Sequence, residues 1–422
     1  MKTILKKSVV LGVILIGFSV YAQNRSLDNY KPQDQDGTGI FEAPKDSVST
    51  FDGVKVRIGG ASTLQFQALD NENSGVAPLG DVGSNFNLAT ANLDLDVALY
   101  DGVRMHLRTY LSSRHHPEPY VKGGYFQIDK LNFISEGFLE DIMNHATIKI
   151  GHMENNYGDA HFRRSDNAQT IFNPFVGNLI MDSFTTEVGA ELYYQCDSGL
   201  LGMVGFSNGK LNQNVKEVDG TTGGAAFLAK LGYDKQINDD FRFRLTGSLY
   251  NTGYAQSVYL YTADRAGSRY YNIMQSATAT SDNFRSGRFD PGFKNKITAV
   301  MINPFLKYDG LEVFGTVELT SGRALTETDR RKATQYAGEI IYRFGDAEKV
   351  YIGGRYNTVS AELASGDDIS VDRFQLGAGW FMTKNILLKA EYVNQKYNDY
   401  PTGDLLEDGK FNGLMLEAAI SF

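Results

Sequence analysis

The sequence lacks a disulfide framework, long apolar runs and an excess of basic side chains. Its single cysteine, Cys196, cannot form a disulfide within the chain, so a disulfide-stabilised scaffold is excluded. No apolar stretch beyond residue 22 approaches the about 18 residues that a membrane-spanning helix needs, which excludes helical membrane proteins. The net charge of −9 argues against general binding to nucleic acid or to anionic lipid.

Glycine and aromatic residues are abundant instead. The chain has 44 Gly, 24 Tyr and 26 Phe but only 9 Pro, a composition that favours aromatic-rich strands joined by glycine turns. A length of about 400 residues after a leader suggests two or three domains, although one large barrel can take their place.

The N-terminus has the organisation of a signal peptide. Lys2, Lys6 and Lys7 precede an apolar stretch at 9–20, and small residues at the −3 and −1 positions predict cleavage after Ala22. Residues 1–22 are therefore expected to direct export. Residues 23–52 are polar and show no periodicity, so they are interpreted as a flexible periplasmic segment or as a segment inside the mouth of the fold.

The C-terminal stretch "GLMLEAAISF", residues 413–422, alternates strictly between an apolar and a mixed face and ends on Phe422. This is the period of a β-strand. In an exported chain the pattern resembles the terminal strand of outer-membrane β-barrels, which the barrel assembly machinery recognises. The alternative is an ordinary amphipathic strand of a soluble protein.

The same alternation recurs through the chain and decides between these alternatives. In "RFQLGAGWFM", residues 373–382, Phe374, Leu376 and Trp380 share one face, and Arg373 and Gln375 share the other. Charged side chains recur on the inner face in segment after segment, which a packed soluble core would not tolerate and a water-filled lumen would. Sixteen strands are predicted, at 54–69, 84–99, 103–112, 122–135, 145–151, 186–196, 200–207, 223–233, 241–251, 296–307, 311–320, 333–344, 349–359, 369–382, 386–396 and 412–422.

Short and long connections alternate between these strands. The pattern predicts an all-β fold, a transmembrane antiparallel β-barrel of residues 53–422, with both termini in the periplasm and the long loops outside. In the turn at 100–102, a three-residue loop ending on Gly102 would pair Leu99 with Val103 and Val97 with Met105. On the inner face, Asp96 would then oppose His106, and Asp94 would oppose Arg108.

Motifs for catalysis or metal binding are weak. Gly205-Phe206-Ser207-Asn208-Gly209 fits a nucleophile elbow, but no helix is predicted after it, as the serine hydrolase mechanism requires. The histidines form no H-E-x-x-H motif, and "DQDG" at 34–37 lacks the other ligands of a calcium loop. We therefore predict no catalytic residues, metal or cofactor, and keep a hydrolase acting through Ser207 as a remote alternative.

Charges of both signs are predicted on the inner wall. The basic residues are Arg104, Arg108, Lys149, Lys230, Arg242, Arg244, Arg343, Arg355, Arg373 and Lys389, and the acidic residues are Asp94, Asp96, Glu187, Glu191, Glu312, Glu318, Glu339, Glu391 and Glu417. Such a wall orients polar solutes across the channel or holds itself together through salt bridges. Of these, Arg104, Arg108, Asp94, Asp96, Lys149, Arg242 and Arg244 are our predicted pore-lining residues.

The stretch "NYGDAHFRRSDN", residues 156–167, lies in the third long connection, 152–185. A sixteen-stranded barrel is too wide for its wall to fill, so a loop that folds inward is expected to narrow it. Arg163 and Arg164 would present cations there, with Asp159, His161 and Asp166 beside them. These five residues are our predicted pore constriction.

The run "GHMENNYGDAHFRRSDNAQTIFNPFVGNLIMDSFTTEVGAELYY", residues 151–194, resembles that of the phosphate-selective porin O/P family. The resemblance implies a trimeric, sixteen-stranded diffusion channel in the outer membrane. Characterised members select anions through a ladder of arginines and lysines that leads to the constriction. Arg163 and Arg164 match the inner end of such a ladder. The chain departs from the family pattern because acidic residues on its wall nearly balance the basic ones.

The sequence thus predicts an outer-membrane porin for small hydrophilic solutes. A channel selective for anions such as phosphate is the main alternative. A hydrolase that acts through Ser207, and an adhesive or structural barrel that acts through loop 252–295, are the less favoured alternatives.

Overall fold

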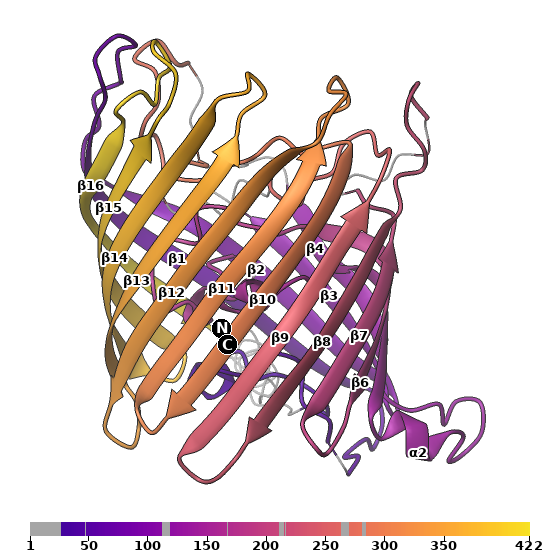
Figure 1. Cartoon of the computed structure of the whole chain (residues 1–422). Helices are drawn as coiled ribbons and strands as arrows, with labels where there is room; N and C mark the ends of the chain where they lie inside the picture. The colour runs from indigo at the N-terminus through magenta and orange to yellow at the C-terminus, as the bar shows by residue number, and fades with distance from the viewer. Residues whose placement is uncertain are drawn as a thin grey trace, which may run out of the picture.

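The sixteen predicted strands are present and close into one antiparallel barrel (Figure 1). The computed structural model describes residues 27–46, 48–111, 119–166, 168–210, 215, 217–262, 270–280 and 284–422, so the predicted signal peptide lies outside the described residues. Each strand pairs with its neighbours in sequence, and β1 pairs with β16 to close the ring. The strands are β1 (Lys55–Glu72), β2 (Asn85–Tyr100), β3 (Val103–Leu111), β4 (Tyr120–Ile128), β5 (Ala146–Glu154), β6 (Thr186–Gln195), β7 (Leu200–Ser207), β8 (Ala226–Gln236), β9 (Phe241–Thr252), β10 (Lys296–Tyr308), β11 (Leu311–Arg323), β12 (Arg331–Phe344), β13 (Val350–Glu362), β14 (Asp368–Thr383), β15 (Ile386–Asn398) and β16 (Lys410–Ser421).

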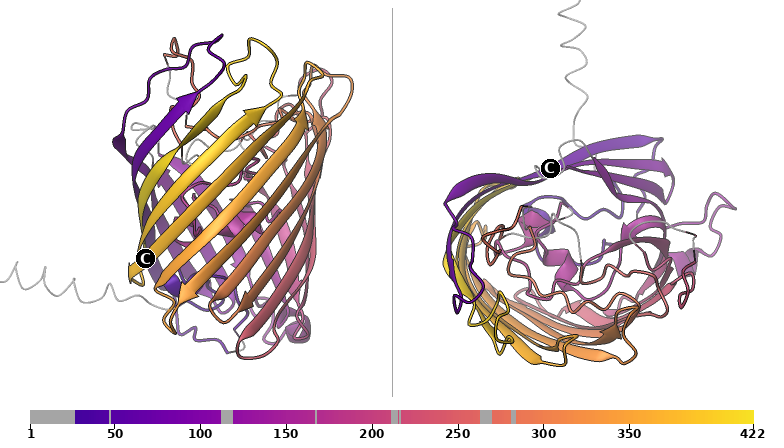
Figure 2. Two further views of the ribbon diagram at one scale, coloured as in Figure 1. Left: turned by 60° about the vertical axis from the view of Figure 1, so that its left-hand side comes forward. Right: turned by 90° about the horizontal axis from the view of Figure 1, so that it is seen from above.

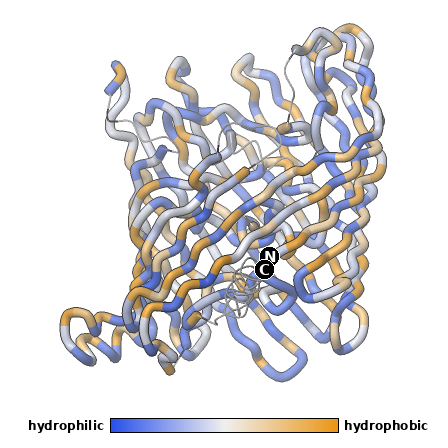
Figure 3. The backbone as a smooth tube through the Cα atoms, turned by 180° about the vertical axis from the view of Figure 1, so that it is seen from behind, coloured by the Kyte–Doolittle hydropathy of each residue, from blue (hydrophilic) through white to orange (hydrophobic). Residues whose placement is uncertain are grey.

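The faces of the barrel are inverted relative to a soluble protein. Along β14, Phe374, Leu376 and Trp380 are exposed on the outside, whereas Arg373 and Gln375 are buried inside. Hydrophilic and hydrophobic residues alternate along the tube in Figure 3 in the same way. The period of two predicted from the sequence is therefore confirmed for β14, with the predicted residues on each face. No helix among the described residues is long and apolar enough to cross a membrane.

The predicted register of the β2–β3 hairpin is confirmed at three of its four pairs. Asp94 pairs with Arg108, Asp96 with His106, and Val97 with Met105. The pairing of Leu99 with Val103 is wrong, because Tyr100 pairs with Val103 and the register shifts between Ala98 and Tyr100. A bulge leaves Leu99 unpaired in β2. The turn therefore has two residues, and the side chains further along both strands still lie on the predicted faces.

The fourth strand was predicted to run to residue 135, but β4 ends at Ile128. The next two N–H groups, of Asp129 and Lys130, donate to the carbonyl of Gly102 instead of continuing the β4–β5 ladder. Residues 129–145 form a longer connection that contains the short helix α2 (Glu140–Met143). Local apolar periodicity could not show where these N–H groups find their partners.

Three segments lie within the barrel (Figure 2). We call residues 155–185 the inner loop; it carries the 3-10 helices η2 (Ala160–Arg163) and η3 (Thr170–Phe172). The second is the described part of the connection between β9 and β10, and the third is the N-terminal segment, residues 27–46, with η1 (Gln35–Gly37). We call the end of the barrel that carries α2 and the tight turns the short-turn end, and the other the long-loop end (Figure 1).

Candidate functional site

The inner loop crosses the barrel and binds the opposite wall. The loop leaves from β5 and returns into β6, yet the N–H groups of Val176 and Gly177 donate to Glu391 of β15, at 2.7 and 3.1 Å. The N–H of Ile180 donates to Asn357 of β13, at 2.7 Å. Because β13 to β15 lie across the ring from β5 and β6, the loop spans the interior.

Arg163 and Arg164 are held by separate sets of carboxylates. Arg163 contacts Glu312 of β11 at 2.6 Å and Glu339 of β12 at 3.1 Å. Arg164 donates to both oxygens of Asp182, at 2.7 and 2.9 Å, and contacts Asp166 at 3.2 Å. Both guanidinium groups are buried, so each fixes a part of the inner loop: Arg163 to the wall and Arg164 to the end of the loop itself.

Asp159 occupies the most basic environment of the five predicted constriction residues. It accepts from Arg244 at 2.8 and 2.9 Å, from Lys230 at 2.9 Å and from Thr246 at 2.7 Å, all on the inner wall of β8 and β9. Burial acts to raise the pKa of Asp159, but Lys230 and Arg244 outweigh it and hold that pKa well below the usual range. Asp159 is therefore ionised and anchors the start of the inner loop.

The other two predicted constriction residues lie near the β5 side of the inner loop. Asp166 contacts Lys122 of β4 at 3.1 Å in addition to Arg164. His161 lies 2.8 Å from Glu154 through one ring nitrogen and 3.0 Å from Asn156 through the other. The five residues thus belong to one loop but take part in different contacts.

The predicted pore-lining residues face the interior of the barrel. Arg108 donates to both oxygens of Asp94, at 2.7 and 2.6 Å. Asp96 is surrounded by Arg57, Arg104 and His106, at 3.3, 3.3 and 2.8 Å. Arg242 pairs with Asp234 at 2.7 Å, and Lys149 is half-buried. The wall beside β2 and β3 is consequently held together by charge pairs, one of the two roles that the sequence left open.

The N-terminal segment contributes side chains that the sequence did not single out. Glu42 contacts Arg244 at 2.7 Å, and Lys31 lies 3.9 Å from the centre of the Phe172 ring in the inner loop. Tyr30 lies under the guanidinium groups of Arg57 and Arg104. The contacts place residues 27–46 in the mouth of the barrel, one of the two positions considered for this segment. The few apolar and aromatic residues in this mostly polar stretch, such as Leu27 and Phe41, were a local signal for such packing.

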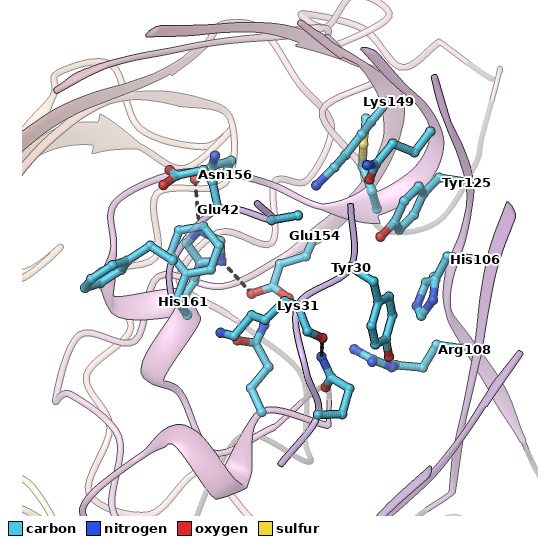
Figure 4. Close-up of a pocket in the computed structure, with 18 of the residues that line it drawn as sticks. Tyr30, Lys31, Glu42, His106, Arg108, Tyr125, Lys149, Glu154, Asn156 and His161 are labelled. Atoms are coloured by element: carbon cyan, nitrogen blue, oxygen red, sulfur yellow. Dashed lines mark hydrogen bonds and ion pairs between the residues drawn. The ribbon is translucent and has the colours of Figure 1, made fainter. Parts of the chain in front are cut away.

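A cavity of about 150 Å³ remains between the N-terminal segment, β3 to β5 and the inner loop (Figure 4). Its basic lining residues are Lys31, Arg104, Arg108, Lys122 and Lys149, and its acidic ones are Glu42 and Glu154. Among the described residues no ion pair holds Lys149, whose ammonium lies 4.9 Å from the ring of Tyr193 and 5.7 Å from that of Tyr125. Arg104, Arg108 and Lys122 are paired with Asp96, Asp94 and Asp166, so the basic character of the cavity comes mainly from Lys31 and Lys149.

The weak catalytic motif does not form a nucleophile elbow. The Ser207 hydroxyl is buried at the end of β7 and donates to Glu187 of β6. The segment after it leads into residues 208–210 without a helix, so the strand–turn–helix geometry is missing there. In the described part of the chain, no three His, Cys, Asp or Glu side chains are grouped so that they could hold a metal ion.

A closed sixteen-stranded barrel with an apolar outside, a charged inside and an inner loop has the architecture of outer-membrane porins. The fold is similar to that of an anion-selective porin from Comamonas acidovorans, with a TM-score of 0.56 and 11% identity over 87% of this chain and 100% of that chain. It is also similar to that of the outer membrane channel DcaP of Acinetobacter baumannii, with a TM-score of 0.52 and 13% identity over 88% of this chain and 98% of that chain. A third similar structure is the trimer form of OmpT, an outer membrane protein of Vibrio cholerae. Its TM-score is 0.52, with 13% identity over 88% of this chain and 100% of that chain.

At such low identity these similarities establish the fold alone. No protein-family model matches the chain, and no curated protein matches its sequence.

Proposed function

We propose that the chain is an outer-membrane porin through which small hydrophilic solutes diffuse passively. The observation that carries this proposal is the barrel with apolar side chains outside and charged side chains inside, because such a barrel suits lipid around it and water within it. On this proposal, residues 1–22 are a cleaved signal peptide and the short-turn end faces the periplasm. The barrel assembly machinery recognises the C-terminal strand, and the mature protein is a homotrimer in the outer membrane.

The inner loop is proposed to narrow the channel. Its backbone bonds to Glu391 and Asn357 carry it across the interior. Asp159 and Arg163 tie it to one part of the wall, through Arg244 of β9 and Glu312 of β11 respectively. Arg163 and Arg164 would then set the size of the constriction by holding the loop, rather than by presenting unpaired cations to solutes.

Uptake by vesicles tests the porin proposal. The purified chain in lipid vesicles is expected to admit small neutral sugars at rates that fall with sugar size, because solutes must pass a narrow aqueous section. The same measurement is made on a chain that lacks residues 27–46. Uptake no faster than in protein-free vesicles for both chains would contradict the proposal.

An anion-selective channel, with phosphate among its solutes, is the second candidate. The observation that favours it is the cavity, in which Lys31 and Lys149 add to three basic side chains already paired with Asp94, Asp96 and Asp166. Anions would gain from this charge as they leave water. The balance of charges on the whole wall does not favour it in the same way.

The reversal potential across a salt gradient decides between the two candidates. If the channel is anion-selective, chloride should permeate more readily than potassium. This selectivity should fall in Lys149→Gln, because no described residue forms an ion pair with the Lys149 ammonium in the cavity. The matched control is Lys235→Gln, an exposed lysine at the end of β8. Equal permeability to both ions in the unmodified chain would leave the unselective porin as the function.

A further inference from the structure

The N-terminal segment makes contacts around the whole short-turn end of the barrel. Near β3, the carbonyl of Asn29 accepts from Arg104 at 3.3 Å. The N–H of Gln35 donates to the carbonyl of Lys384 in the β14–β15 turn at 2.8 Å, and its side chain donates to Ala347 in the β12–β13 turn at 2.8 Å.

The segment then continues around the ring. Gly39 accepts from Arg242 of β9 at 2.9 Å, and Lys45 reaches the carbonyl of Ala146 at the start of β5 at 2.7 Å. Following the strand order from β3 through β1, β14, β12 and β9 to β5 completes nearly the full circle. The segment therefore contacts the short-turn opening on nearly all sides.

The centre of the segment reaches the inner loop. Phe41 is 2% exposed, and its ring centre lies 5.9 Å from that of Phe162 in the inner loop and 5.2 Å from that of Phe305 on β10. Next to it, Glu42 accepts from both terminal nitrogens of Arg244, at 2.7 and 3.0 Å. Arg244 also holds Asp159, so one arginine joins the segment to the inner loop.

The barrel is closed without this segment. β1 and β16 pair from Ala61 with Ser421 to Glu72 with Lys410, and residues 27–46 contribute no strand to the ring. The segment is held by side-chain pairs, a few backbone bonds and one buried aromatic ring, and the chain has no second cysteine that could fix it covalently. Its contacts can therefore be broken while the strand pairing of the barrel stays intact.

We propose that residues 27–46 form a plug that closes the channel at the short-turn end, and that solutes pass only when the plug withdraws. This inference rests on the proposed porin function and concerns its regulation. The plug acts from the opposite end to the one from which the inner loop enters. Phe41 and Glu42 are the residues that fix the plug to the inner loop and the wall.

A reversible crosslink tests the plug directly. Gln35→Cys with Lys384→Cys, in a Cys196→Ser chain, joins positions whose backbones are hydrogen-bonded and therefore near enough for a disulfide. Phe41→Ser and Glu42→Gln are added to weaken the docked state. In planar bilayers, the oxidised chain is expected to conduct several-fold less than the same chain after reduction with dithiothreitol.

Two further chains complete the experiment. Deletion of residues 27–46 should give the high conductance without any response to dithiothreitol, and Val48→Ser, at an exposed position outside the plug, should conduct as the unmodified chain does. Equal conductance of the oxidised and reduced chains, or no gain on deletion, would overturn the plug. Folding of the deletion chain is checked by its heat-modifiable migration in gel electrophoresis. If this folded chain does not conduct either, the porin function itself is contradicted.

Discussion

Asp159 illustrates how one residue on a polar loop can hold that loop to the barrel wall. The sequence predicted its presence at the constriction from the position of the loop, and predicted Arg244 on the wall from the period of β9. It could not predict their contact, because the two residues are far apart in sequence and meet only when the loop folds inward. The pair is enclosed by protein, and Arg244 also contacts Glu42 and Asp234, so losing Asp159 removes one of the three carboxylates that balance its buried charge.

Asp159→Asn should therefore destabilise the inner loop. Arg244 and Lys230 would lose one of the carboxylates that balance their buried charges, and because Glu42 stays beside both, the cost should lie below the roughly 3–5 kcal/mol of a buried pair that is broken completely. Urea-induced unfolding in lipid vesicles, followed by tryptophan fluorescence of Trp380, measures the loss. The control is Asp36→Asn, whose carboxylate pairs with Lys384 in water, and it should leave the unfolding midpoint unchanged. Equal midpoints for the two variants would contradict the account.

Lys31 should make the docking of the plug depend on pH. Burial lowers the pKa of Lys31 to about 7, against the opposing effects of Glu154 and Glu42 and with a small contribution from Arg163. A free lysine keeps its proton up to a pH of about 10.4. Between these values docking releases a proton, so the docked state gains stability as the pH rises and loses it again as the pH falls towards 7.

The conductance of the unmodified chain should accordingly rise as the pH is lowered from 9 to 7. The equilibrium for docking changes by at most about tenfold per pH unit for a single proton. Lys31→Met should remove most of this dependence while the other charged lining residues, among them Lys122, Lys149 and Arg108, remain. A dependence of the same size in Lys31→Met would assign it to another group.

At the scale of elements, the strands were predictable and their ends were not. Alternation of apolar and polar residues follows from the pleat and needs no knowledge of distant partners, so all sixteen strands were found. The bulge at Leu99 depends on how β2 pairs with β3, and the end of β4 at Ile128 depends on backbone bonds to the β2–β3 turn, neither of which a local pattern contains.

The inner loop should loosen when its bond to the wall is cut. Arg163→Ala removes a partner of Glu312 and Glu339, leaving two buried carboxylates less compensated and the η2 region without its ion pairs to β11 and β12. We expect a larger and noisier single-channel conductance, best measured in the chain that lacks residues 27–46. Arg330→Ala, an exposed arginine between β11 and β12, is the control. An unchanged conductance would show that the loop holds its place without this contact.

At the scale of the whole molecule, the class of fold followed from the sequence and the filling of its interior did not. The inverted faces and the alternation of short and long connections indicate a porin-type barrel. Residues 27–46 have no periodicity, and their side chains find partners as distant as Arg244 of β9 and Lys384 of the β14–β15 turn. Only long-range packing decides that such a segment lies inside the mouth rather than beside it.

The central claim is that this barrel is a water-filled channel. Single-channel recording in planar bilayers, with the complete mature chain and with the chain that lacks residues 27–46, tests it most directly. We predict discrete conductance steps that grow in proportion to salt concentration, larger in the shortened chain. Folded protein that inserts into the bilayer but gives no steps in either form would contradict the account.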